Sequence, residues 1–515
     1  MAEFNSARPK RNDATSAALL TVNATRNVMA IYVLVVFMGF PGTFSKVIGG
    51  GVASLLEKLS WGMQFLLVLL ASGDDVWDIK LVNLKPAYRY IYLYFLFICV
   101  ESLLVSINRK TVITTLIHFL LTIMFALWLI EAYDSEELME ILCISQMLFV
   151  GFILMLIVVF PGIAFFNYQG ARTLRGVFVT KNELGTELAF GILVQSILLR
   201  MRRTKNEPVS FLFLAMIGLQ FLLILMTRNM GAMLITIGFI SYILYYGMSK
   251  TKRRLPLGLI FVVVSISFLF FALTILQALD PLLESLGKDA SLTGRVPLWE
   301  RAIFVMMDSH TLTGYGLEMF WKTQDVVDFF HAGFNPYGWA ANSSASMHNM
   351  IMELWCNTGL LGIAFFFFLM IRSGRGIRYM EENQYLFCSA YTVMFTIRGL
   401  TERQTNPSTM YYLMLMVILG LMYQSEYRHK FDSVRKARIY VSPDPTEVTP
   451  RPAFGYAAEQ DTSDLTAFQL RFSNAAEQPK KVQTRRSTSF DDWDEPEEKT
   501  KTLDDLFAEI GGDDW

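Results

Sequence analysis

The chain has 515 residues, of which 53% are hydrophobic and 14% aromatic, and its mean hydropathy is +0.37. This composition lies well beyond that of a soluble domain and predicts an integral membrane protein. The formal net charge is only −1, so the charge balance gives no reason to expect a nucleic-acid partner. The sequence has no phosphate-binding glycine-rich loop and no dinucleotide fingerprint, which argues against an ATP-driven pump.

Twelve apolar segments predict about twelve transmembrane helices, because each is long enough to cross a hydrocarbon core about 30 Å thick. In chain order they are residues 28–47, 53–72, 88–107, 111–130, 140–161, 184–200, 208–226, 230–248, 255–278, 350–372, 384–400 and 408–424. The expected fold is therefore an all-α integral membrane protein, with a short cytoplasmic segment over residues 1–27 and a polytopic membrane domain over residues 28–430. The first segment is not a cleavable signal peptide, since no small-residue cleavage site follows it.

Basic residues predict the orientation, because loops rich in Lys and Arg stay on the cytoplasmic side. Basic clusters follow the sixth, eighth, tenth and twelfth segments: Arg200–Lys205, Lys250–Arg254, Arg372–Arg378 and Arg428–Arg438. They share one side if both termini are cytoplasmic. That topology places the long loop between the ninth and tenth spans, residues 280–349, on the outer face.

The end of the chain differs in composition from the rest. Residues 431–515 are predicted to form a cytoplasmic tail, mostly disordered because it is rich in Pro, Ser, Thr, Gln and charge. Residues 502–511 place four apolar side chains on one face of a short helix. That helix could dock on another cytoplasmic component, or the segment could remain a weakly structured acidic tail.

Cations gather on the predicted outer face, where the orientation rule expects few. Arg228 interrupts an apolar stretch twice the length of one span, and an arginine at a helix centre costs about 2.5–3.5 kcal/mol on insertion. The further outer-face cations are Arg172, Arg175, Lys181, Arg295, Arg301, Arg398 and Arg403. Guanidinium groups donate paired hydrogen bonds to phosphate oxygens, so the cluster suggests an anionic ligand. The alternative for Arg228 is a hairpin residue that extends to lipid phosphate. No Asp-x-Asp pair stands in the outer loops to hold Mg²⁺, so we expect neither a metal nor a cofactor.

His348 ends the outer loop, directly before the tenth span. A neutral imidazole there could accept a proton from a sugar hydroxyl, and Asn349 and Glu353 could orient the ring. The alternative is a capping or packing role. An aromatic-rich segment that includes Trp321 precedes His348. Its rings could stack on sugars and so form a glycan platform, or equally anchor an interfacial helix at the depth of the lipid headgroups. His118, within a span, is expected to make an interhelical contact.

Four short motifs carry a resemblance to a known family. They are Arg175–Gly185 (RGVFVTKNELG), Thr227–Met230 (TRNM), Leu292–Trp299 (LTGRVPLW) and His348–Gly362 (HNMIMELWCNTGLLG). In this order, with a long outer loop late in the chain, they resemble the O-antigen ligase and Wzy-type polymerase superfamily, in particular ExoQ-like exopolysaccharide polymerases. The resemblance covers roughly residues 170–425.

The resemblance implies a GT-C-like helical fold in the bacterial inner membrane, and a donor glycan linked to undecaprenyl pyrophosphate. By this analogy, Arg228 and Arg295 grip the donor pyrophosphate and His348 lies at the acceptor hydroxyl. Glu402 is a second candidate base. The remaining substrate-binding candidates are Lys181 and Asn182, expected near the donor, with Arg175, Arg301, Arg398 and Trp321.

The implied reaction is polymerisation of lipid-linked repeat units at the periplasmic face, without metal and with inversion, in exopolysaccharide biosynthesis. A ligase that transfers glycan to lipid A core shares the donor chemistry, and a protein O-glycosyltransferase is a third option. A polyisoprenoid-glycan transporter is the rival from another class, although transporters place charges near the bilayer midplane. The tail suggests coupling to components that control chain length or export.

Overall fold

The structure is a computed structural model, and it describes residues 13–39, 49–69, 85–168, 171–178, 180–208, 211–248, 257–271, 295–334, 345–404 and 406–441. The predicted tail helix over residues 502–511 lies outside the described residues, as do residues 280–294 and 335–344 of the outer loop.

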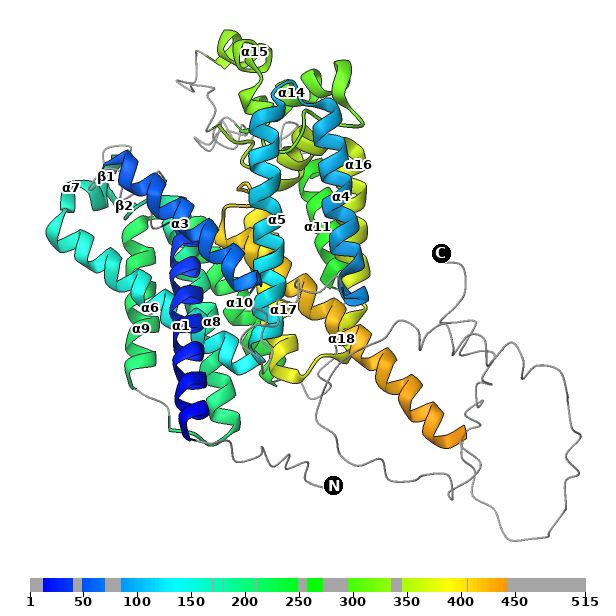
Figure 1. Ribbon diagram of the computed structural model, residues 1–515. Coiled ribbons are helices and arrows are strands. Elements are labelled where there is room, and N and C mark those ends of the chain that lie inside the picture. The colour runs from blue at the N-terminus through cyan, green and yellow to red at the C-terminus, as the bar shows by residue number, and fades with distance from the viewer. Residues whose placement is uncertain are drawn as a thin grey trace, which may run out of the picture. The chain divides into compact units, whose positions relative to one another are not determined.

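Each of the twelve predicted apolar segments contains a helix (Figure 1). These helices are α1 (Asp13–Phe37), α3 (Gly50–Leu69), α4 (Arg89–Val105), α5 (Arg109–Ala132), α6 (Ser135–Val159), α8 (Lys181–Thr204), α9 (Phe211–Thr227), α10 (Met230–Met248), α11 (Leu257–Phe270), α16 (Met350–Ser373), α17 (Glu382–Gly399) and α18 (Met410–Val441). Among the described residues, seven helical stretches are long and apolar enough to cross a membrane. The helical membrane class is therefore confirmed, whereas the count of twelve crossings and the GT-C-like arrangement stay predictions.

Two boundaries differ from the expectation. Helix α1 already begins at Asp13, within the segment expected to precede the first span, and α18 continues to Val441, past residue 430. Hydropathy marks only the most apolar part of a helix, so a prediction from hydropathy does not include more polar extensions at the helix ends. A small antiparallel hairpin, β1 (Phe165–Tyr168) and β2 (Ala171–Leu174), follows the short helix α7 (Pro161–Ala164) and was not expected.

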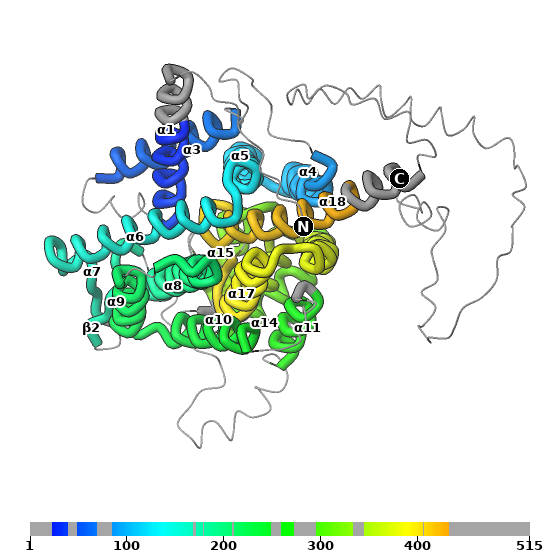
Figure 2. The backbone as a smooth tube through the Cα atoms, turned by 90° about the horizontal axis from the view of Figure 1, so that it is seen from below, coloured from blue at the N-terminus to red at the C-terminus, as the bar shows by residue number. Residues whose placement is uncertain are grey.

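Three helices form the centre of the bundle. Every residue of α18 from Met410 to Gln424 is buried, as expected for a helix that is apolar all round. Helix α17 packs against α8 and α10, and the view in Figure 2 places α8, α17 and α18 inside the ring of the other helices. Because α8 and α18 begin where α17 ends, polar residues at these termini meet at one end of the bundle.

The outer loop folds around a hydrophobic core of its own. It contains α14 (Arg295–Val305), the π-helical turn η3 (Met306–His310), the 3₁₀ turn η4 (Phe320–Lys322) and α15 (Gln324–Phe334). The indole of Trp299 is fully buried and donates a hydrogen bond to the carbonyl of Met347, 2.7 Å away. This bond fixes α14 beside the residue that precedes His348. Two further turns outside the loop are η1 (Pro86–Tyr88) and η6 (Gly376–Tyr379).

A break in α16 fastens this loop to the membrane helices. Gly359 has φ 65° and ψ −172°, a conformation that disfavours any residue with a Cβ. The Leu360 amide donates to the carbonyl of Thr311 at 3.0 Å, and a Cβ on Gly359 would lie 2.1 Å from the carbonyl oxygen of Leu312. The glycine within the NTG sequence of the last motif is therefore required for close backbone contact.

Candidate active site

The turn between α9 and α10 docks on the first turn of α8. Arg228, at its tip, is exposed and has φ 51°. The carbonyl of Arg228 accepts a hydrogen bond from Lys181 Nζ at 3.4 Å, and Asn229 Nδ2 donates to the carbonyl of Asn182 at 3.2 Å. A Cβ on Gly185 would lie 2.8 Å from Asn229 Nδ2, so the glycine of the KNELG sequence allows this approach. Two predicted cations and Asn182 thus lie together.

Glu402, on the turn after α17, connects three other predicted site residues. Its Oε1 accepts hydrogen bonds from Asn182 Nδ2 at 2.9 Å and from Arg295 Nη2 at 3.3 Å. Its Oε2 lies 3.1 Å from Nδ1 of His348. The four side chains come from α8, α14, the start of α16 and the turn after α17, so the fold gathers residues that are far apart in the sequence.

The charge state of Glu402 distinguishes the two candidate bases. Burial alone would raise the pKa of this carboxyl, but its hydrogen bond and charge interaction with His348, together with the charges of Arg295 and Arg398, lower its pKa below the ordinary value. A carboxylate whose pKa is lowered is a weak proton acceptor. Because an ionised carboxylate only accepts hydrogen bonds, His348 carries its proton on Nδ1, and Nε2 is then the basic nitrogen. Glu402 is better suited to orient the imidazole than to act as the base.

The backbone around His348 is held by its neighbours. Asn349 is the N-cap of α16: its Oδ1 accepts from the amides of Ile351 and Met352 at 2.9 and 3.0 Å. Glu353 accepts from the amide of Met347 at 2.8 Å. The helix cap is therefore Asn349. Asn349 and Glu353 hold the backbone on either side of His348, and the ring of His348 contacts Glu402. His348 itself has φ 47°, an uncommon conformation that often occurs at functional sites.

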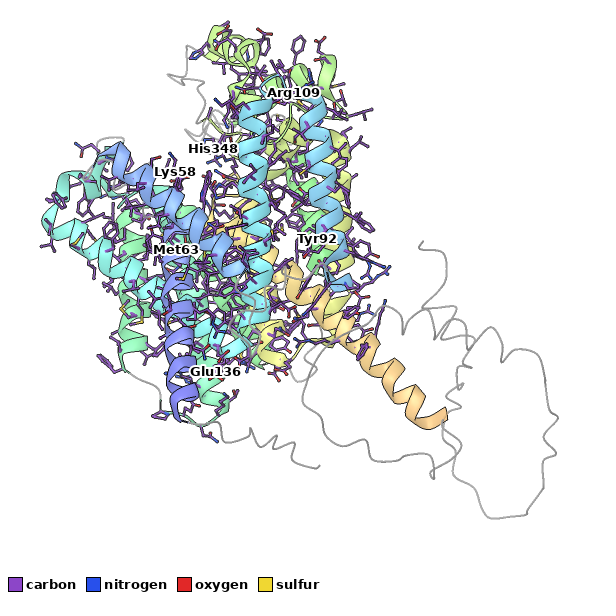
Figure 3. The ribbon with its side chains drawn as sticks, in the orientation of Figure 1. Lys58, Met63, Tyr92, Arg109, Glu136 and His348 are labelled. Atoms are coloured by element: carbon purple, nitrogen blue, oxygen red, sulfur yellow. The ribbon has the colours of Figure 1, made fainter. Side chains whose placement is uncertain are left out.

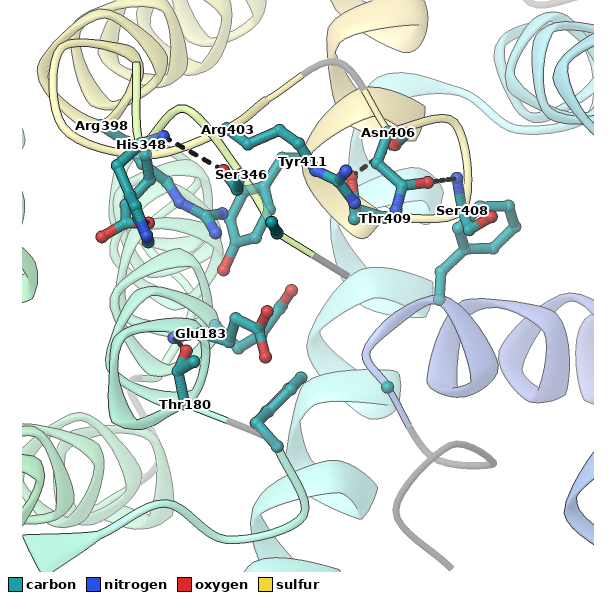
Figure 4. A pocket seen from close by; sticks show the side chains of 16 residues that line it. Thr180, Glu183, Ser346, His348, Arg398, Arg403, Asn406, Ser408, Thr409 and Tyr411 are labelled. Carbon is teal, nitrogen blue, oxygen red and sulfur yellow. Dashed lines mark hydrogen bonds and ion pairs between the residues drawn. The ribbon is translucent and has the colours of Figure 1, made fainter. Parts of the chain in front are cut away.

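A cavity of about 480 Å³ lies beside His348 and Glu402 (Figure 4). Its polar lining residues are Thr180, Glu183, Glu187, Ser346, His348, Arg398, Glu402, Arg403, Asn406, Ser408, Thr409 and Tyr411. Arg398, a predicted substrate-binding residue, is buried with its guanidinium carbon 3.4 Å from the centre of the Tyr411 ring. Arg403 forms ion pairs with Glu318 at 3.0 Å and Glu353 at 3.7 Å, which tie the α17–α18 turn to the outer loop.

Three predicted substrate-binding residues lie elsewhere. Arg175 packs over the Phe166 ring of the β-hairpin, and its Nε donates to the carbonyl of Ile163 at 3.3 Å. Arg301 donates to the carbonyl of Phe329 within the outer loop at 3.3 Å. Trp321 is buried in the core of that loop, where its ring contacts Phe330. None of the three lines the cavity, and the packing of Trp321 disfavours the glycan platform and the headgroup anchor alike.

Two acidic residues of α8 were missed as candidate site residues. Glu183 and Glu187 both line the cavity, and Glu187 is only 2% exposed. A signal was present, since an acidic residue inside an apolar span is rare and usually functional. The expected interhelical contact of His118 is confirmed: it is buried in α5, and the centre of its ring lies 4.5 Å from that of Trp61 in α3.

Two comparisons with known proteins indicate which family the chain resembles. Residues 211–367 match the family model described as O-Antigen ligase. Over 321 residues the chain is 22% identical to the "Exopolysaccharide production protein ExoQ" of Rhizobium meliloti (strain 1021), and the match covers 59% of this chain and 69% of that protein. The family match includes Arg228, Arg295 and His348. Both comparisons confirm the resemblance that the motifs predict, which is to the O-antigen ligase and ExoQ-like family.

Proposed function

We propose that this protein is a membrane glycosyltransferase of polysaccharide biosynthesis, and specifically a polymerase of lipid-linked repeat units. The observation that carries the proposal is the network in which Glu402 joins Arg295 to His348, at 3.3 Å and 3.1 Å. Arg295 would stabilise the departing anion and His348 would accept the proton of the attacking hydroxyl, and both contact the same carboxylate. This is the pair of groups that transfer from a phosphate-linked sugar requires.

The donor in this proposal is a glycan linked to undecaprenyl pyrophosphate. The acceptor hydroxyl of a second repeat unit attacks the anomeric carbon of the donor sugar and forms the new C–O bond. The bond from that carbon to the pyrophosphate oxygen breaks on the opposite face, so the configuration inverts. The hydroxyl proton passes to Nε2 of His348, and undecaprenyl pyrophosphate departs as the anion.

Arg295, Lys181 and Arg228 form the donor side of the proposed site. Arg295 contacts Oε1 of Glu402, and Lys181 contacts the carbonyl of Arg228. Negative charge grows on the leaving pyrophosphate during the reaction, and fixed guanidinium groups bind it more tightly in the transition state than in the ground state. These cations supply charge stabilisation without a metal ion.

The proposed setting is the bacterial inner membrane, with both termini in the cytoplasm and the site at the periplasmic face. The basic clusters in or just after the last turns of α8, α10, α16 and α18 all fall on the opposite side under this topology. The tail after residue 441 would then be available to cytoplasmic components that control chain length or export.

Polymerase is preferred to ligase because the curated relative is named for exopolysaccharide production. Ligase is the second candidate, since the family model that matches residues 211–367 is described as O-Antigen ligase. A transporter is disfavoured because the network gathers at helix ends and loops, whereas transporters bind substrate near the bilayer midplane.

The test uses purified protein in nanodiscs with a lipid-pyrophosphate-linked repeat unit, EDTA, and neither nucleotide nor any other acceptor. A ladder of glycan products on a gel is expected, and it should disappear in Arg295→Ala. Arg200→Ala is the matched control, because Arg200 pairs with Glu382 away from the site and should leave the ladder intact. Transfer that occurs only after lipid A core is added would indicate the ligase. No transfer to any acceptor would refute the proposal.

A further inference from the structure

The cavity beside His348 contains a second set of polar groups that the proposed chemistry does not use. Glu183 and Glu187 stand one helical turn apart on α8, and both line the cavity with His348 and Arg398. In Figure 4, Glu183 lies across the cavity from Arg398 and Tyr411, with Thr180 below it. Three helices, α8, α17 and α18, therefore direct polar side chains into one space.

One of these groups is buried with hydrogen-bonding capacity that the described residues do not use. Among the described residues, no partner is present for Nε and Nη1 of Arg398, which is 5% exposed. Glu187 and Tyr411, which are 2% and 4% exposed, interact with each other through their side chains. An unsatisfied buried polar group costs roughly 1–3 kcal/mol, and more if it is charged, so proteins retain such groups where a ligand or water uses them.

The chemistry of the lining fits a sugar better than a pyrophosphate. Carboxylates accept hydrogen bonds from hydroxyl groups, and a guanidinium donates to hydroxyl and ring oxygens, so together they satisfy a neutral polyol. The lining holds three acidic side chains, those of Glu183, Glu187 and Glu402, and only two basic ones, those of Arg398 and Arg403, a balance that does not favour a diphosphate. The volume of about 480 Å³ is within the range of about 300–1,000 Å³ typical of small-ligand sites.

Glu402 divides this cavity from the donor cations. Its Oε1 contacts Arg295 and Asn182, whereas its Oε2 contacts His348, which lines the cavity. We propose that the cavity is the acceptor subsite, in which Glu183 and Glu187 bind hydroxyls of the terminal sugar of the acceptor glycan. This inference rests on the proposed function, because it assigns one of the two substrates of that reaction to the cavity.

The test separates the two substrates kinetically. The lipid-linked donor is held at saturation, and a free oligosaccharide of the repeat unit, without lipid or pyrophosphate, is titrated as acceptor. Glu183→Gln and Glu187→Gln should each raise the acceptor KM about tenfold or more, the effect of losing a charge-assisted hydrogen bond, with the donor KM within about twofold of wild type. Glu101→Gln is the matched control, because Glu101 is also buried in an apolar helix, α4, but does not line the cavity.

An unchanged acceptor KM in Glu183→Gln, or an equal rise in donor KM, would overturn the inference. If Glu187→Gln does not fold, Glu183→Gln decides alone, since Glu183 is only partly buried. Calorimetric titration of the free oligosaccharide, without donor, measures acceptor binding alone and therefore tests the acceptor subsite separately from the proposed polymerase function. Weaker binding by Glu183→Gln than by wild type supports the subsite even if no transfer is seen, and equal or undetectable binding by both proteins contradicts it.

Discussion

The two ends of the helix bundle differ in how their charged groups are paired (Figure 3, where His348 and Glu136 mark them). At the end near Glu136, cations lie in close ion pairs: Arg372 makes two bonds to Glu426 at 2.5 and 2.9 Å, and Arg200 pairs with Glu382 at 2.7 Å. At the end near His348, the Glu402 carboxylate contacts three predicted site residues, and Arg398 has two nitrogens without a hydrogen-bond partner among the described residues. A close, bidentate ion pair stabilises a fold, whereas the unpartnered nitrogens of Arg398 leave hydrogen-bonding capacity for a substrate.

The largest effect is expected from His348→Ala, because a positioned general base contributes about 10²–10⁴-fold to a rate. Turnover should fall by that factor while the protein remains monodisperse in detergent. Radiolabelled chain extension in nanodiscs measures the loss. An unchanged rate, with Glu402→Gln inactive, would transfer the role of base to Glu402.

Arg295→Ala should follow, with a loss on the order of 10²-fold or more, comparable to removing one donor that stabilises a developing anion. The thermal unfolding midpoint should change little, since Arg295 contributes one partly exposed ion pair. Arg200→Ala sharpens the comparison, because it breaks an ion pair at the opposite end and should leave turnover per folded molecule unchanged. Equal rate losses in the two variants would contradict the distinction between the ends.

Arg372→Met should have the converse effect, on stability. It leaves the carboxylate of Glu426, only 8% exposed, with Lys430 at 3.3 Å in place of its bidentate partner, at a cost of about 1–3 kcal/mol. We expect a lower thermal midpoint and normal turnover per folded molecule at permissive temperature. A variant that folds normally but turns over slowly would show that this end also takes part in catalysis.

The smallest effect concerns pH and Glu402. Because the folded state lowers the pKa of this carboxyl, its contribution to stability is complete above the ordinary glutamate pKa of about 4.3 and is lost as pH falls through the lower folded-state value. The thermal midpoints of wild type and Glu402→Gln should therefore differ at pH 7 and converge below about pH 4. A difference that grows on acidification would contradict the lowered pKa.

The helices could be predicted from the sequence because a lipid-exposed segment must be apolar over its whole length. The start of α1 at Asp13 was not accessible, since those polar residues carry no hydropathy signal. Candidate site residues such as Arg228 and His348 could be proposed because a polar or charged residue beside a span is costly and therefore noticeable, and their roles stay predictions. The burial of Trp321 could not be predicted, because a run of aromatic residues is compatible both with a surface platform and with a buried core.

The connections within the site depend on packing that no local pattern encodes. Glu402 meets His348, Arg295 and Asn182 across 54, 107 and 220 residues of sequence. The resemblance placed Arg295 and His348 in one site but did not reveal that a carboxylate joins them. Glu187 shows the opposite case, since its position within an apolar helix already indicated a function.

The central claim is that Arg295 and His348 act as one unit through Glu402, and a double-mutant cycle on turnover tests it most directly. Initial rates would be measured for wild type, Arg295→Ala, His348→Ala and the double variant in nanodiscs with the lipid-linked repeat unit. If the residues act as a unit, the double variant should be no slower than the slower single variant. Losses that simply multiply would show that the two residues act independently and would contradict the shared role of Glu402.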